Sequence, residues 1–171
     1  MTARTTQLMA WAREQQAAME SLLRELVEIE SPSSDADGVA RLARRLADEL
    51  RACGLDPALV PVNGAGPLLT ASGGGAGAPV MLLGHLDTVW PLGTLRTRPL
   101  RRQGDALYGP GTFDMKGGLV VALFALRALL AAGQRPSVLF FLTPLEEVGA
   151  DAYRARMEEA MRGSAAVLGF E

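Results

Sequence analysis

The chain has very few of the residues that build disulfide frameworks, metal sites and nucleic-acid surfaces. In 171 residues it has one cysteine, Cys53, one histidine, His85, and one lysine, Lys116. A single cysteine excludes an internal disulfide framework and a cysteine-based zinc finger. Any chemistry that needs an imidazole must therefore use His85.

Charge and apolar patterning argue against two classes of partner. The 17 basic side chains are spread along the chain and opposed by 19 acidic ones, for a net charge of −2, so no nucleic-acid surface is expected. The longest apolar run, residues 118–133, contains Arg127 and is shorter than the roughly 20 residues that a membrane-spanning helix needs. The N-terminus lacks the apolar stretch of a secretory signal. We therefore expect no membrane partner and a cytoplasmic location.

Hydrophobic periodicity predicts alternating helices and strands. Helical spacing is found at about 5–30, 35–52, 117–132 and 150–161. Short apolar runs predict strands at 79–84, 138–143 and 165–170, two further short strands within 55–72 and a small hairpin at 100–108. The alternation predicts an α/β fold, in which a mostly parallel, mixed sheet is covered by helices on both faces.

Acidic side chains and the only histidine gather where predicted strands end or where the apolar helix begins. These residues are His85, Asp87, Asp114, Glu146, Glu147 and Glu171. Ligands of open α/β sheets bind beyond the carboxyl ends of the strands, and zinc accepts histidine nitrogen and carboxylate oxygen. A site with more carboxylate than imidazole also suits two metal ions. Asp87 lies two residues after His85, so its carboxylate can accept the free ring N–H.

Each of these residues also has a structural interpretation. A histidine after a buried strand can be a satisfied core group, and paired glutamates can begin a solvated helix, where the helix dipole favours acids. Asp114 can cap the following helix, Glu171 can be an exposed terminal residue, and Lys116 can lie on a solvated surface. Their joint placement around the single histidine favours a metal site.

Other catalytic and binding motifs are absent or misplaced. The glycines at 73–77 lead into a predicted strand rather than a helix, so they do not form a phosphate loop. The sequence has no GxxxxGK[ST], GxSxG or HExxH pattern. The helix that starts at Gly117 can bind an anion at its N-terminus, as a secondary feature of the same site.

Four segments resemble the motif series of a known enzyme family. They are GHLDTVWP (84–91), YGPGTFDMKGGLVVAL (108–123), LTPLEEVGA (142–150) and VLGFE (167–171). In order and spacing they resemble the zinc aminoacylase and carboxypeptidase family that includes glutamate carboxypeptidase, acetylornithine deacetylase and succinyl-diaminopimelate desuccinylase. The resemblance runs from about residue 22 to the last residue.

The resemblance implies a role for each candidate residue. His85 and Glu171 would bind one zinc, Glu147 would bind the second, and Asp114 would bridge the two. Glu146 would be the general base and acid, and Asp87 would support His85. The peptide bond between Asp114 and Met115 is expected to be cis, as in members of this family.

The activity that the resemblance implies is amide hydrolysis by zinc-activated water. A glutamate-carboxypeptidase-like enzyme, which releases a C-terminal amino acid from a small peptide or N-acyl amino acid, is the first expectation. An N-acyl amino acid deacylase is the alternative within the same chemistry, and a non-catalytic binding module that keeps the fold is a third. Two Zn²⁺ are expected, although such a carboxylate-rich site can also accept Co²⁺ or Mn²⁺.

Two departures from the family pattern stand out. Leu145 occupies a position before the paired glutamates where an acid is usual. Members of the family are also longer, with a lid and dimerisation domain and a later metal-binding histidine. Residues 1–171 are therefore expected to form the N-terminal part of a zinc-hydrolase catalytic domain. Alone, this part is expected to be inactive, and the full-length form is expected to dimerise through the lid.

Overall fold

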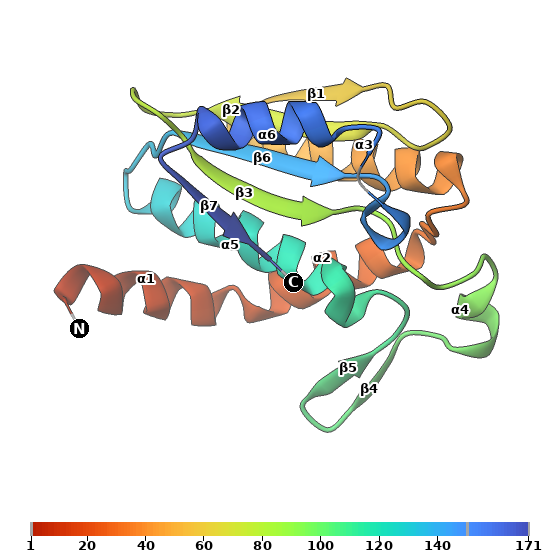
Figure 1. Ribbon diagram of the computed structural model, residues 1–171. Coiled ribbons are helices and arrows are strands. Elements are labelled where there is room, and N and C mark those ends of the chain that lie inside the picture. The colour runs from red at the N-terminus through yellow and green to blue at the C-terminus, as the bar shows by residue number, and fades with distance from the viewer. Residues whose placement is uncertain (1, 150, 171) are drawn as a thin grey trace.

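A computed structural model describes residues 2–149 and 151–170. Figure 1 shows a central sheet with helices packed on it and a small hairpin that projects from one end. The helices are α1 (Ala3–Glu14), α2 (Gln16–Glu28), α3 (Ala36–Ala52), α4 (Thr94–Thr97), α5 (Gly118–Ala131) and α6 (Arg154–Arg162). The strands are β1 (Asp56–Val60), β2 (Leu68–Gly73), β3 (Val80–His85), β4 (Arg101–Gln103), β5 (Ala106–Tyr108), β6 (Val138–Thr143) and β7 (Ala166–Gly169). Two short helical turns are η1 (Thr112–Gly117) and η2 (Glu146–Val148).

The central sheet is mixed and has the strand order β1-β2-β6-β3-β7. β2 pairs antiparallel with β1 and β6, whereas β3 pairs parallel with β6 and β7. His85 at the end of β3 is paired with Thr143 at the end of β6. The two segments that follow these strands therefore leave the sheet side by side, at the edge where an α/β fold places its ligands.

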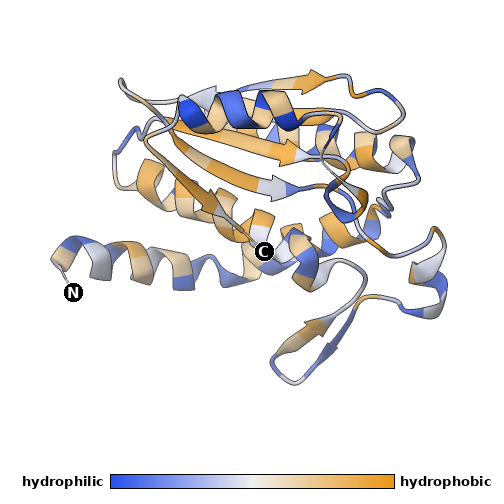
Figure 2. Ribbon diagram, viewed as in Figure 1, coloured by the Kyte–Doolittle hydropathy of each residue, from blue (hydrophilic) through white to orange (hydrophobic). Residues whose placement is uncertain are grey.

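Helices cover both faces of the sheet, as the sequence predicts. Successive residues of β6 point to opposite faces, so Phe140 joins the core formed with α2, α3 and α5, and Phe141 joins a smaller core with Tyr153 and Met157 near α6. Apolar residues accordingly line the inner strands and the inner sides of the helices (Figure 2). Across the described residues, no helix is long and apolar enough to cross a membrane.

Three local features differ from the sequence expectations. The first predicted helix is divided at Gln15, which ends α1 with φ −88° and ψ 2°. The last helix begins at Arg154 instead of 150, because Tyr153 turns into the smaller core and is 2% exposed. The loop after β3 contains the short helix α4, which has too few residues to produce a periodic pattern.

The core of β6 provides a test of this arrangement. Phe140 is 2% exposed between the sheet and the helices, whereas Phe113 is 86% exposed. We expect Phe140→Ala to lower the free energy of unfolding by about 3–5 kcal/mol, because it removes buried apolar surface and leaves a cavity. Phe113→Ala is the matched control and should change it by less than about 0.5 kcal/mol. Urea unfolding followed by circular dichroism measures both, and equal effects would contradict the described core.

Candidate metal centre

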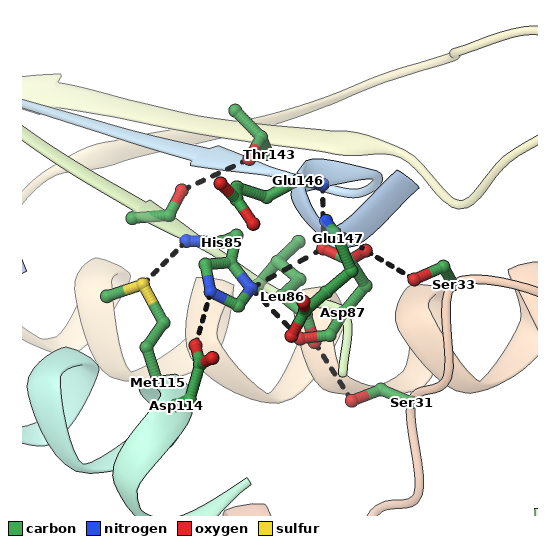
Figure 3. A network of polar contacts seen from close by, with 11 residues as sticks. Ser31, Ser33, His85, Leu86, Asp87, Asp114, Met115, Thr143, Glu146 and Glu147 are labelled. Carbon is green, nitrogen blue, oxygen red and sulfur yellow. Dashed lines mark hydrogen bonds and ion pairs between the residues drawn. The ribbon is translucent and has the colours of Figure 1, made fainter. Parts of the chain in front are cut away.

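His85 is held in a fixed orientation at the end of β3. Its side chain is buried, and ring Nδ1 lies 2.9 Å from the backbone oxygen of Asp87. The other ring nitrogen, Nε2, lies 2.8 Å from Oδ1 of Asp114 (Figure 3). A neutral imidazole that donates from Nδ1 to the carbonyl keeps the Nε2 lone pair for a metal ion.

Asp114 reaches His85 because the chain turns sharply before α5. Gly111 has φ 69°, and the Asp114–Met115 peptide bond is cis, as the family resemblance implies. Met115 is fully buried, and its sulfur accepts a hydrogen bond from the backbone N–H of His85 at 2.9 Å. The Asp114 side chain is 52% exposed, which leaves its carboxylate open to solvent on the side away from His85.

Asp87 holds the Glu146–Glu147 turn in place. Its carboxylate is buried and accepts the backbone N–H groups of Glu146 at 3.0 Å and Glu147 at 3.3 Å. Ser33 in the α2–α3 linker donates a third hydrogen bond at 2.6 Å. The carboxylate is 3.5 Å from Nδ1 of His85, which lies nearer to the Asp87 backbone oxygen. The expected support of His85 thus comes mainly from the backbone of Asp87, because its carboxylate faces the turn.

Glu147 brings a carboxylate oxygen without a partner to the same place. Its Oε1 is buried and has no hydrogen bond within the described part of the chain. One ligand atom from each of His85, Asp114 and Glu147 lies within 4.8 Å of the others. A buried oxygen without a partner is costly, and a cation between these three side chains would satisfy it. The donor set of one imidazole and two carboxylates fits zinc.

The pKa shifts report a strongly negative environment. Burial, followed by the negative charge of Asp114, raises the pKa of the Glu147 carboxyl above its usual range. For His85, burial lowers the pKa, but contacts with Asp87 and Asp114 outweigh it and raise the pKa to about 9. In both cases the neighbouring carboxylates favour the protonated form, and for Glu147 burial does so as well.

Lys116 does not lie on a solvated surface. It is 2% exposed, and its Nζ donates to the backbone oxygen of Ile29 at 2.7 Å. Burial lowers the pKa of its ammonium group to about 7, although nearby Glu30 opposes this shift. Lys116 therefore ties η1 to the end of α2, and the solvated alternative for this residue was wrong.

Most of the residues singled out in the sequence meet at one place. His85, Asp87, Asp114, Glu146 and Glu147 all lie around the ends of β3 and β6. Glu171, the expected second ligand of the first zinc, lies outside the described residues. Sequence reasoning missed Ser33, because nothing in an isolated serine indicates a contact with a residue 54 positions later.

Comparison with known proteins agrees with this arrangement. The profile described as Peptidase family M20/M25/M40 matches residues 81–170, just over half of the chain. Carboxypeptidase G2 from Pseudomonas sp. (strain RS-16) is 32% identical over 165 residues, which cover 94% of this chain and 40% of that protein. Succinyl-diaminopimelate desuccinylase from Corynebacterium glutamicum is 35% identical over 108 residues, 63% of this chain and 27% of that protein.

The solved structures show the same fold. The crystal structure of human carnosine dipeptidase 1 superimposes with a TM-score of 0.83 at 23% identity, covering 96% of this chain and 40% of that one. The chain thus spans less than half the length of the relatives that it matches.

Ser33 tests how the carboxylate of Asp87 is held. Burial raises the pKa of Asp87, but nearby His85 and the hydrogen bonds from Ser33 and the backbone of Glu146 hold it below its usual range. We expect Ser33→Ala to lower the free energy of unfolding at pH 7 by about 1.5–3 kcal/mol, the range for a hydrogen bond to a charged group. A depressed pKa contributes stability above the unfolded value, so the difference should shrink as the pH falls below about 4.

Ser34 provides the matched control for this experiment. It is exposed and lies next to Ser33 in the chain, so Ser34→Ala should have little effect. Chemical unfolding of both variants at pH 7 and in acid measures the difference. Equal stabilities at pH 7 would show that Ser33 does not hold Asp87.

Proposed function

The chain belongs to the peptidase family M20/M25/M40, and we propose that it forms the metal-binding part of an amide hydrolase. The proposed reaction is the release of a C-terminal amino acid from a small peptide or an N-acyl amino acid, in the manner of a glutamate carboxypeptidase. Similarity to carboxypeptidase G2 over nearly the whole chain supports this choice. Dimerisation through a lid domain and a cytoplasmic location stay predictions.

The observation that carries the proposal is the buried Oε1 of Glu147 beside His85 and Asp114, which has no hydrogen-bond partner in residues 2–149 and 151–170. In the proposed site His85 would hold one zinc and Glu147 a second, and the carboxylate of Asp114 would be shared between them. Glu171 would complete the first site. When bound, zinc supplies a water whose pKa is lowered to about 7 and a Lewis acid for the substrate carbonyl. Cobalt or manganese can take its place in such a donor set.

The remaining chemistry belongs to side chains around the metal ligands. Glu146 has an exposed side chain and a backbone held by Asp87, which suits a residue that must meet the substrate. In the proposal its carboxylate takes the proton of the attacking water and delivers it to the leaving nitrogen. Asp87 keeps Glu146 in place without touching the substrate. Leu145 is half-buried in the smaller core, so the usual acid is replaced there by a packing residue.

An N-acyl amino acid deacylase is the second candidate. It uses the same metal site and the same proton transfers, and similarity to succinyl-diaminopimelate desuccinylase supports it. A non-catalytic binding module would have no need for an unpartnered carboxylate oxygen next to the only histidine. The proposed ligands therefore favour an enzyme over such a module.

Metal binding is the first test of the proposal. We expect the zinc-loaded 171-residue chain to retain zinc after gel filtration, because one ligand atom from each of three donor side chains lies within 4.8 Å of the others. His85→Ala and Glu147→Gln should each weaken zinc binding by about tenfold or more. Glu158→Gln, on the exposed side of α6, is the control and should bind as the parent does. Mass spectrometry of the eluted metal measures the ratio, and a folded parent chain without zinc would count against the site.

Hydrolysis by the full-length protein is the second test. Glu146→Gln should lower kcat by about 10²–10⁴-fold, the contribution of a positioned general base and acid. Its zinc content should stay unchanged, because Glu146 is not a proposed ligand. Rates with a dipeptide and with an N-acetyl amino acid distinguish the two candidate activities. A Glu146→Gln rate within a few-fold of the parent would remove Glu146 from the mechanism.

A further inference from the structure

We infer that a second pocket, next to the metal centre, binds a carboxylate group at the far end of the substrate. It has a volume of about 470 Å³ and is lined by Trp90, Arg98, Arg101, Tyr108 and Pro110, among others. This inference rests on the proposed function for its link to a substrate. The pocket itself can be tested without a metal ion.

The arginines are held in a way that suits carboxylate binding. The guanidinium carbon of Arg98 lies 5.1 Å from the ring centroid of Trp90, and that of Arg101 lies 5.2 Å from the ring centroid of Tyr108. An aromatic ring under one face of a guanidinium group orients it. The N–H groups at its edge stay available, and their planar fork matches the two oxygens of a carboxylate.

The positive charge of the pocket is not neutralised within the described residues. Neighbouring and more distant arginines have acidic partners, as Arg102 has in Glu20 and Arg127 in Glu49. In residues 2–149 and 151–170, no carboxylate forms an ion pair with Arg98 or Arg101, and no acidic side chain lines the pocket. Arg101 Nη1 donates to Oε1 of Gln103 at 3.5 Å, which is a long hydrogen bond to a neutral group. An anion that enters the pocket therefore meets two guanidinium groups whose charge is not neutralised by a carboxylate of the described residues.

The pocket lies within reach of the metal ligands. Trp90 is five residues after His85, and Pro110 is four residues before Asp114. At no more than about 3.5 Å per residue, these segments span at most roughly 18 and 14 Å. In Figure 1 the chain that leaves the end of β3 leads to α4 and then to the β4–β5 hairpin, and both lie outside the central sheet. A substrate two to four residues long can therefore place its scissile bond at the metal and a carboxylate in this pocket.

The loop that carries Arg98 is anchored to the body of the protein. The Glu30 carboxylate accepts the backbone N–H groups of Gly93 at 2.8 Å and Leu95 at 2.9 Å. These hydrogen bonds lower the pKa of Glu30, so it is ionised at neutral pH. The anchor fixes the start of α4 and the arginine that follows it. A pocket formed in advance loses less conformational entropy when it binds.

Trp90 provides a direct readout of binding. The chain has two tryptophans, Trp11 and Trp90. In the Trp11→Phe variant, tryptophan fluorescence therefore comes from Trp90 in the pocket alone. In this variant, freed of metal with EDTA, glutarate should change the fluorescence in a saturable way with a dissociation constant in the millimolar range. Glutaramide, the uncharged analogue, should have at least fivefold lower affinity. Inorganic phosphate should also bind more weakly than glutarate, whereas tighter binding of phosphate would overturn the carboxylate assignment.

Variants of the arginines locate the binding site. Added to the Trp11→Phe chain, Arg98→Gln and Arg101→Gln should each weaken glutarate binding at least fivefold. Arg135→Gln is the control, since Arg135 is an arginine at the far end of the sheet, next to the start of β6. Isothermal titration calorimetry repeats the measurement without relying on Trp90. Unchanged affinity in Arg98→Gln and Arg101→Gln, or glutarate binding only when zinc is present, would overturn the inference.

Substrate preference in the full-length protein connects the pocket to the reaction. Arg98→Gln should raise KM for an N-glutaryl amino acid at least fivefold and leave KM for the N-butyryl analogue within twofold. An equal rise in KM for both substrates would show that the pocket does not bind the carboxylate. If the parent hydrolyses neither substrate, the proposed function fails, while the metal-free titration still decides whether the pocket binds carboxylates.

Discussion

The candidate site depends on the buried carboxylate of Asp87. A charge removed from water costs several kcal/mol unless hydrogen bonds compensate for it, and here three donors from two separate segments do so. Ser33 comes from the linker after α2, and the N–H groups of Glu146 and Glu147 come from the turn after β6. The carboxylate therefore fixes the position of both segments relative to β3. The general base and the second metal ligand of the proposed mechanism are placed by a residue that performs neither role.

The negative charge around His85 explains why this arrangement calls for a cation. Asp87, Asp114 and Glu147 lie near one imidazole, and the raised pKa values of His85 and Glu147 show that each gains from added positive charge. Protons relieve part of the repulsion but leave Oε1 of Glu147 without a partner. A divalent cation would relieve the repulsion and satisfy the oxygen together. In the proposed site, one metal ion would therefore meet both requirements.

The elements that set the site were predictable from the sequence to different degrees. Strand β6 has the bounds expected from its apolar run, and His85 lies at the end of β3 as expected, because continuous apolar segments mark strands buried on both faces. The contacts of Ser33 and Lys116 were not predictable. Each joins segments more than 50 positions apart, and a single sequence carries no local pattern for such a pair. The proposed metal ligands were predicted from their positions at strand ends and from the family resemblance, whereas the contacts that support them required the fold.

Short connections carry the residues proposed to take part in the reaction, whereas a long connection carries those proposed to recognise the substrate. The parallel pairing of His85 with Thr143 brings the ends of β3 and β6 together, and Glu146 follows only three residues after β6 ends. Short connections from rigid strands allow little variation in the positions of reacting groups. The segment from Thr88 to Thr112 is much longer, contains α4 and the β4–β5 hairpin, and carries both arginines of the second pocket. Changes in this segment can alter which substrate is recognised, while the strand ends and the proposed metal ligands next to them keep their positions.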